Sequence, residues 1–209
     1  MITCLLEVKQ NLDYLKRYID NNLHAKYSDI VIEPMNAKGN AMQVYNYAED
    51  FLKKEENASK YLYYEKHLVF DCDAPENIQQ VITLMKDSGN DYILDYSNLL
   101  FETWLVMHFQ NLEPEKDNSK RTIIKLMRDY LKVTKYTNKI KASKGTIGKI
   151  LGSNGNEKIR AAIENAKLLE KHWKDKGKDM DRDITQMNPA VDIYKLIERL
   201  LDEIVYLCG

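Results

Sequence analysis

Four short runs of apolar and β-favouring residues alternate with helical patterns over the first 96 residues, and this alternation constrains the fold more than any other feature of the chain. The runs cover residues 2–8, 29–34, 67–73 and 91–96. Strands that alternate with helices form βαβ units, which build parallel sheets. We therefore predict an α/β fold with a mainly parallel four-stranded sheet flanked by helices.

The segments between these runs carry helix and turn signals. Leu and Ile recur at helical spacing between residues 12 and 23. We expect Pro34 to end the second strand and Gly39 to lead into a polar helix. Pro75 suits the first turn of the next helix, and Gly89 suits its end.

The second half of the chain has a different character, because its patterns are helical and no run indicates a strand. The expected helices cover about residues 98–110, 119–132, 145–152, 156–175 and 189–207. A charged linker is predicted over Lys174–Asp183, ahead of the last helix. We predict two regions: an α/β core over residues 1–110, and a helical region over residues 111–209 packed on that core.

Composition excludes several classes of protein. With 44% hydrophobic and 30% charged residues, the chain is typical of a folded globular protein. A net charge of -1 excludes a uniformly basic nucleic-acid binder, so such a site would need local clustering. The three cysteines form no CxxC pair, which suits a reducing compartment, and no apolar run approaches the length of a membrane span. The expected location is therefore the cytoplasm, without a membrane.

The most informative chemical feature is an Asp-x-Asp at the end of the third run. Side chains alternate along a strand, so Asp71 and Asp73 should project on one side, with Cys72 facing away. The carboxyl end of a strand in an α/β sheet is a usual ligand site, and paired carboxylates suit hard cations such as Mg2+. The alternative is a solvated turn before Ala74 and Pro75.

Glu7 is a second candidate, because it lies near the end of the first run, where a carboxylate could face the two aspartates across the sheet. The alternative is a surface glutamate. A third candidate is the apolar segment 97–109, in which Glu102 shares a predicted helix face with Asn98, and His108 lies on a neighbouring face. Burying a carboxylate or a histidine there is costly without a partner or ligand, although His108 alone would suit a hydrogen-bonded core histidine.

The fourth feature is a charge pattern. Residues 130–156 contain no Asp or Glu but carry six lysines, which are Lys132, Lys135, Lys139, Lys141, Lys144 and Lys149. With two interleaved tyrosines, this stretch has the character expected for contacts with nucleic-acid phosphates. The alternative is a lysine-rich solvated surface. A Walker A motif is absent from the sequence, which argues against P-loop nucleotide hydrolysis.

Together these residues resemble the RloB-like family of bacterial phage-defence proteins, which is related to Toprim (topoisomerase–primase) and OLD-type nucleases. The family pattern has a glutamate ending the first strand, an Asp-x-Asp ending the third, and a Ser-Asn-x-x-Phe-Glu-x-Trp-x-x-x-His-Phe segment. This chain has, in order, Glu7, Asp71-Cys72-Asp73, Ser97-Asn98, Phe101-Glu102, Trp104 and His108-Phe109. The resemblance covers nearly the whole chain.

Other positions complete the comparison with the family pattern. Asn188-Pro189 resembles the Asn-Pro that leads the family's final helix, and either Lys139 or Lys141 matches its central lysine. The chain departs from the pattern at Val8, where the family has glycine, and at Leu99-Leu100, where it has Pro-Cys.

The resemblance implies a Mg2+- or Mn2+-dependent Toprim-like endonuclease of antiphage defence, of the abortive-infection type. Glu7, Asp71 and Asp73 would hold the metal as catalytic residues. Glu102 would complete the metal shell or orient a ligand, and His108 would help proton transfer or brace its helix. The six lysines would hold RNA, tRNA included, or DNA.

The partners implied are nucleic acid and a separate ATPase protein, with a homo-oligomer left open. The alternative function is a non-catalytic nucleic-acid-binding or sensor module of a defence complex, which would keep the acidic site for a structural metal or for docking. Val8 favours this alternative, and the intact aspartate pair favours the enzyme.

Overall fold

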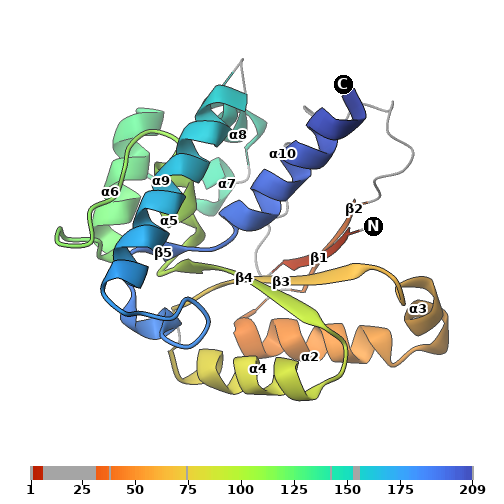
Figure 1. Cartoon of the computed structure of the whole chain (residues 1–209). Coiled ribbons are helices and arrows are strands. Elements are labelled where there is room, and N and C mark those ends of the chain that lie inside the picture. Colours follow the sequence, from red (N-terminus) through yellow and green to blue (C-terminus); the bar gives the residue numbers. More distant parts are fainter. Residues whose placement is uncertain are drawn as a thin grey trace. The chain divides into compact units, whose positions relative to one another are not determined.

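A computed structural model describes residues 2–6, 32–37, 39–73, 75–141, 143–152 and 156–208 (Figure 1). It has a mixed α/β structure, as the sequence predicted. The chain divides into two compact units, Met1–Asp95 and Tyr96–Gly209. The boundary expected between residues 110 and 111 stays a prediction.

The sheet of the first unit is built around a central parallel strand. Strand β1 (Ile2–Leu6) pairs in parallel with β2 (Ile32–Asn36) and with β3 (Glu65–Asp71). Strand β4 (Tyr92–Asn98) follows β3 in the strand order. The prediction that proline ends the second strand was wrong, because Pro34 lies inside β2. β2 is an edge strand, a position in a sheet where proline is tolerated.

Helices cover one face of this sheet. Helices α2 (Ala41–Leu52) and α4 (Pro75–Asp87) run side by side along it (Figure 1). The predicted helix start at Pro75 is confirmed, and α4 ends two residues before Gly89. Helix α3 (Glu55–Lys60) was not predicted, because its six residues bury no side chain and so leave no apolar period in the sequence. The helix expected between residues 12 and 23 lies outside the described residues.

The second unit is mainly helical. Its helices are α5 (Phe101–Val106), α6 (Lys120–Leu131), α7 (Asn138–Lys141), α8 (Lys144–Leu151), α9 (Asn156–Asp175), the 3-10 helix η1 (Ile184–Gln186) and α10 (Tyr194–Cys208). The predictions for α6, α8 and α9 are confirmed to within about a residue. Within the described ranges, no helix has the length and apolar character needed to cross a membrane.

Three predictions about the second unit were wrong. A short strand, β5 (Ala190–Val191), pairs antiparallel with the end of β4, where Asn98 lies opposite Ala190. A two-residue strand has no periodicity, so the sequence could not indicate it. Pro189 therefore leads into β5, and the last helix begins only at Tyr194. The helix expected from residue 98 begins at Phe101, because β4 extends to Asn98.

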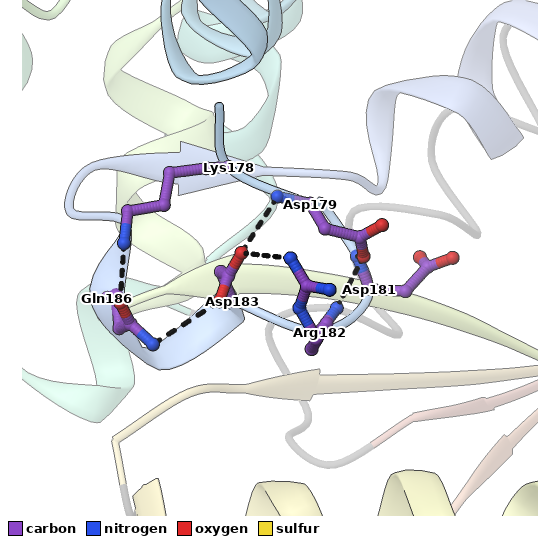
Figure 2. A network of polar contacts seen from close by, with 6 residues as sticks. All are labelled: Lys178, Asp179, Asp181, Arg182, Asp183 and Gln186. Atoms are coloured by element: carbon purple, nitrogen blue, oxygen red, sulfur yellow. Dashed lines mark hydrogen bonds and ion pairs between the residues drawn. The ribbon is translucent and has the colours of Figure 1, made fainter. Parts of the chain in front are cut away.

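The predicted charged linker after α9 is a folded turn (Figure 2). The side chain of Asp179 accepts hydrogen bonds from the backbone N–H of Arg182 at 2.7 Å, and Asp183 accepts one from the N–H of Asp179 at 2.9 Å. These bonds lower the pKa of both carboxyls. Gln186 contacts both Lys178 and Asp183 by its side-chain amide. Local contacts of this kind hold the turn together.

Candidate functional site

The acidic candidates of the first unit lie at the carboxyl end of β3. Four consecutive residues of this strand, His67–Phe70, are buried. Asp71 is the last residue of the strand and is half-buried, Cys72 is buried, and Asp73 is exposed. Because the strand ends at Asp71, strand alternation does not extend to Asp73, and the expected common direction of the two carboxylates stays a prediction.

Strand register brings the end of β1 beside this point. Leu6, which directly precedes Glu7 in the sequence, lies opposite Val69, two residues before Asp71. Glu7 itself lies outside the described residues, so its predicted convergence with the aspartates stays a prediction. Across the residues that are described, no three His, Cys, Asp or Glu side chains gather closely enough to hold a metal ion.

In the second unit, a candidate carboxylate of the segment 97–109 contacts one of the lysines of the stretch 130–156. All six residues of α5 are buried, and Glu102 lies in its first turn. The Glu102 carboxylate forms an ion pair with the ammonium group of Lys141, the last residue of α7. The expectation that a buried Glu102 needs a partner is thus met by one of the predicted phosphate-binding lysines.

Asn98 has a different position from the one predicted. It ends β4 and therefore shares no helix face with Glu102. Its side-chain amide donates hydrogen bonds to the backbone carbonyls of Ile184 at 2.9 Å and Met187 at 2.6 Å. These hydrogen bonds pair two buried carbonyls and connect the end of β4 to the segment that leads into β5.

His108 is buried just beyond the end of α5. Its Nδ1 donates a hydrogen bond to the carbonyl of Trp104 at 3.1 Å, and the two rings meet edge to face at 4.8 Å. Burial lowers the pKa of His108 to about 4. A histidine that is neutral near pH 7 and bonded to the preceding helical turn favours the bracing role over proton donation.

The remaining lysines lie on several elements. Lys132 ends α6 in a left-handed conformation, and Lys135 and Lys139 are exposed. Lys149 reaches the carbonyl of Leu131 at 3.4 Å. Lys144 is the first residue of α8, and its side chain lies outside the described atoms. The five lysines whose side chains are described therefore differ in setting, and among them Lys141 is distinguished by its buried carboxylate partner.

The family model described as RloB-like protein matches residues 9–200. The chain belongs to the RloB-like family. A search of curated proteins returned no match, and neither did a search of solved structures.

One buried polar group of this RloB-like protein was missed from its sequence. His67 on β3 lies 2.7 Å from Asp95 on β4, and its second ring nitrogen lies 3.5 Å from Glu65. Burial alone would lower the pKa of His67, but the two carboxylates outweigh it and raise this pKa above 6.5. The signal was a histidine inside an apolar strand, because a buried ring nitrogen requires a hydrogen-bond partner.

Proposed function

We propose that this RloB-like protein is a metal-dependent nuclease that hydrolyses phosphodiester bonds of RNA, tRNA included, or of DNA in bacterial antiphage defence. One observation carries the proposal. Asp71-Cys72-Asp73 lies at the carboxyl end of a strand that pairs in parallel with β1, and β1 leads directly to Glu7 in the sequence. The carboxyl ends of parallel strands meet at the same sheet edge, where ligands of α/β proteins bind.

The donor atoms at this sheet edge fit Mg2+ or Mn2+. Two carboxylates separated by one residue supply hard oxygen ligands, whereas the thiol between them is buried. Asp71 and Asp73 would hold the metal, together with Glu7. When bound, such an ion activates water and stabilises the charge that develops on a phosphodiester.

The second unit would supply positive charge. Lysines in the acid-free stretch 130–156 would hold the nucleic-acid backbone by counterion release. His108, bonded to the carbonyl of Trp104, would keep α5 and its Glu102 in place. A Toprim-like four-stranded sheet is part of the same proposal, and the parallel pairing of β1 with β2 and β3 supports it.

Cleavage assays test the proposal directly. Purified protein is incubated with tRNA, single-stranded and duplex substrates in Mg2+ or Mn2+. Asp71→Asn and Asp73→Asn should each abolish cleavage while leaving the melting temperature level or higher, because a carboxylate repulsion is removed. Asp87→Asn, an exposed change in the same unit, is the matched control and should keep full activity. Metal-dependent cleavage by the double Asp71/Asp73 variant would refute the assignment.

The alternative is a nucleic-acid-binding or sensor module without catalysis. Val8 favours it, because glycine at this position would allow backbone conformations and close approaches that valine does not. This module would bind Mn2+ and nucleic acid but cleave none of the substrates with either ion. If the Val8→Gly variant cleaves nucleic acid and the wild type does not, then the metal site is intact and Val8 alone prevents catalysis.

A further inference from the structure

We infer that Glu102 acts as a positioning residue for Lys141, holding its ammonium group ready for a nucleic-acid phosphate, rather than as a metal ligand. The inference rests on the proposed nuclease function and assigns one interaction within it. Its basis is the ion pair between the Glu102 carboxylate on α5 and the Lys141 ammonium at the end of α7.

The two partners of this pair differ in their access to solvent. The Glu102 side chain is 3% exposed, whereas the Lys141 side chain is 26% exposed. An incoming ion therefore reaches the lysine before the carboxylate. A divalent cation would meet a positive charge there, and a phosphate would meet a complementary one.

A second interaction restrains the lysine. The ammonium of Lys141 lies 5.1 Å from the centre of the Tyr136 ring, within the range of a cation–π interaction. A lysine side chain is flexible, and a ligand that fixes it must offset the reduced rotamer freedom. Because a carboxylate and a ring already hold Lys141, much of that ordering is complete before a phosphate arrives.

The ammonium keeps capacity for a ligand. It has three N–H donors, and a single carboxylate oxygen uses one of them. The stretch 130–156 around Lys141 contains no Asp or Glu, and the carboxylate that pairs with Lys141 belongs to Glu102 outside this stretch. Exposed Lys135 and Lys139, close to Lys141 in the sequence, would add attraction without the same fixed position.

Replacing Glu102 should change nucleic-acid affinity in opposite directions, depending on whether Glu102 acts only through its negative charge or positions Lys141. Glu102→Gln removes a negative charge, so general electrostatics predicts tighter nucleic-acid binding. Positioning predicts weaker binding, by about tenfold, the scale of one charge-assisted hydrogen bond. Affinity is measured with a fluorescent single-stranded RNA and a DNA duplex over a salt series. Glu113→Gln is the matched control, since Glu113 pairs with Lys116 at 2.6 Å on the exposed surface and should cause no loss.

Mn2+ affinity, measured by electron paramagnetic resonance, separates the roles further. We expect Glu102→Gln and Lys141→Met to weaken nucleic-acid binding alike and to leave Mn2+ affinity unchanged, with no further loss in the double variant. If Glu102→Gln does not fold, Tyr136→Leu, which removes the other restraint, should weaken binding in the same way. Lower Mn2+ affinity in Glu102→Gln, or nucleic-acid affinity equal to or above wild type, would overturn the inference.

Binding measurements on the wild-type protein distinguish failure of the Glu102–Lys141 inference from failure of the proposed nuclease function. A wild type that binds RNA or DNA but no Mn2+ refutes the metal-dependent nuclease, while the Glu102–Lys141 inference is still decided by the variants. A wild type that binds neither nucleic acid overturns both.

Discussion

At the scale of single residues, two buried histidines have opposite electrostatic settings. His67 lies between two carboxylates, which raise its pKa, whereas His108 is bonded to a backbone carbonyl and burial lowers its pKa to about 4. A raised histidine pKa stabilises the fold at low pH, and a lowered one destabilises it there. The two residues should therefore contribute opposite slopes to stability as a function of pH.

The first prediction concerns His67. Its stabilising charge is fully present below about pH 6.5, the unfolded pKa, and disappears as pH rises through the higher folded pKa. Asp95→Asn should therefore lower the free energy of unfolding most at pH 5.5, by about 3 kcal/mol for a broken buried pair, and less at pH 9. Urea unfolding across this range measures it, with Asp87→Asn as an exposed control. A loss that is equal at both pH values would contradict the prediction.

His108 should behave in the opposite way. As pH falls from about 6.5 to 4, the unfolded chain binds a proton that the folded protein excludes, so stability declines. A tenfold change in proton affinity corresponds to about 1.4 kcal/mol, so the decline is about 3 kcal/mol. His108→Leu should remove this part of the acid sensitivity, whereas His172→Leu, at a partly exposed histidine, should keep it. An unchanged acid profile in His108→Leu would show that folding does not lower the pKa of His108.

At the scale of elements, the start of α2 depends on a compact cap. Asn40 accepts a hydrogen bond from the backbone of Gln43 at 3.1 Å, and the Gln43 side chain accepts one from the backbone of Asn40 at 2.9 Å. Such a capping box satisfies two N–H groups at the helix start. Gly39 precedes it with φ of +118°, where an added Cβ would lie 2.1 Å from the Gln43 side chain.

Substituting this glycine should therefore damage the helix start in two ways. Gly39→Ala combines an unfavourable backbone conformation with displacement of Gln43, and should cost about 2 kcal/mol of stability. Gly89→Ala is the matched comparison, because φ is +70° but no atom lies within 4 Å of the added Cβ, so about 1 kcal/mol is expected. Urea unfolding of both variants checks the difference. Equal losses would show that the cap contributes little.

Elements with strong local signals could be predicted from the sequence. Pro75 marked the start of α4, and the periodic pattern over residues 156–175 indicated α9. β5 has two residues and exists through its pairing with Ser97 and Asn98, so long-range contacts determine it. The same holds for the ion pair between Glu102 and Lys141, whose members the sequence marked separately but could not join.

At the scale of the whole molecule, a net charge of -1 conceals an uneven distribution of charge. Many exposed lysines have acidic neighbours, as Lys116 and Lys125 do with Glu113 and Asp129. The stretch 130–156 has six lysines and no acid. An acidic neighbour offsets the electric field of a lysine, and salt screens what remains at distances beyond a Debye length. The acid-free stretch 130–156 should therefore contribute most of the protein's attraction for a polyanion.

The final prediction tests this distribution. Replacing exposed Lys132, Lys135 and Lys139 with glutamine should weaken nucleic-acid binding and reduce the log–log salt slope by about 0.7–0.9 for each phosphate that is no longer neutralised. Mn2+ affinity should not change, because these substitutions remove no oxygen ligand for a metal ion. The control triple replaces three acid-paired lysines, which are Lys53, Lys116 and Lys125.

The two triple variants remove the same formal charge, so a difference between them reports on location rather than on net charge. Each control lysine is paired with a carboxylate that already offsets its positive charge. We therefore expect the control triple to show a smaller decrease in nucleic-acid affinity and a nearly unchanged salt slope. Equal slopes in both triples would mean that the acid-free stretch binds polyanions no better than the rest of the surface, and that its lysines are a solvated face.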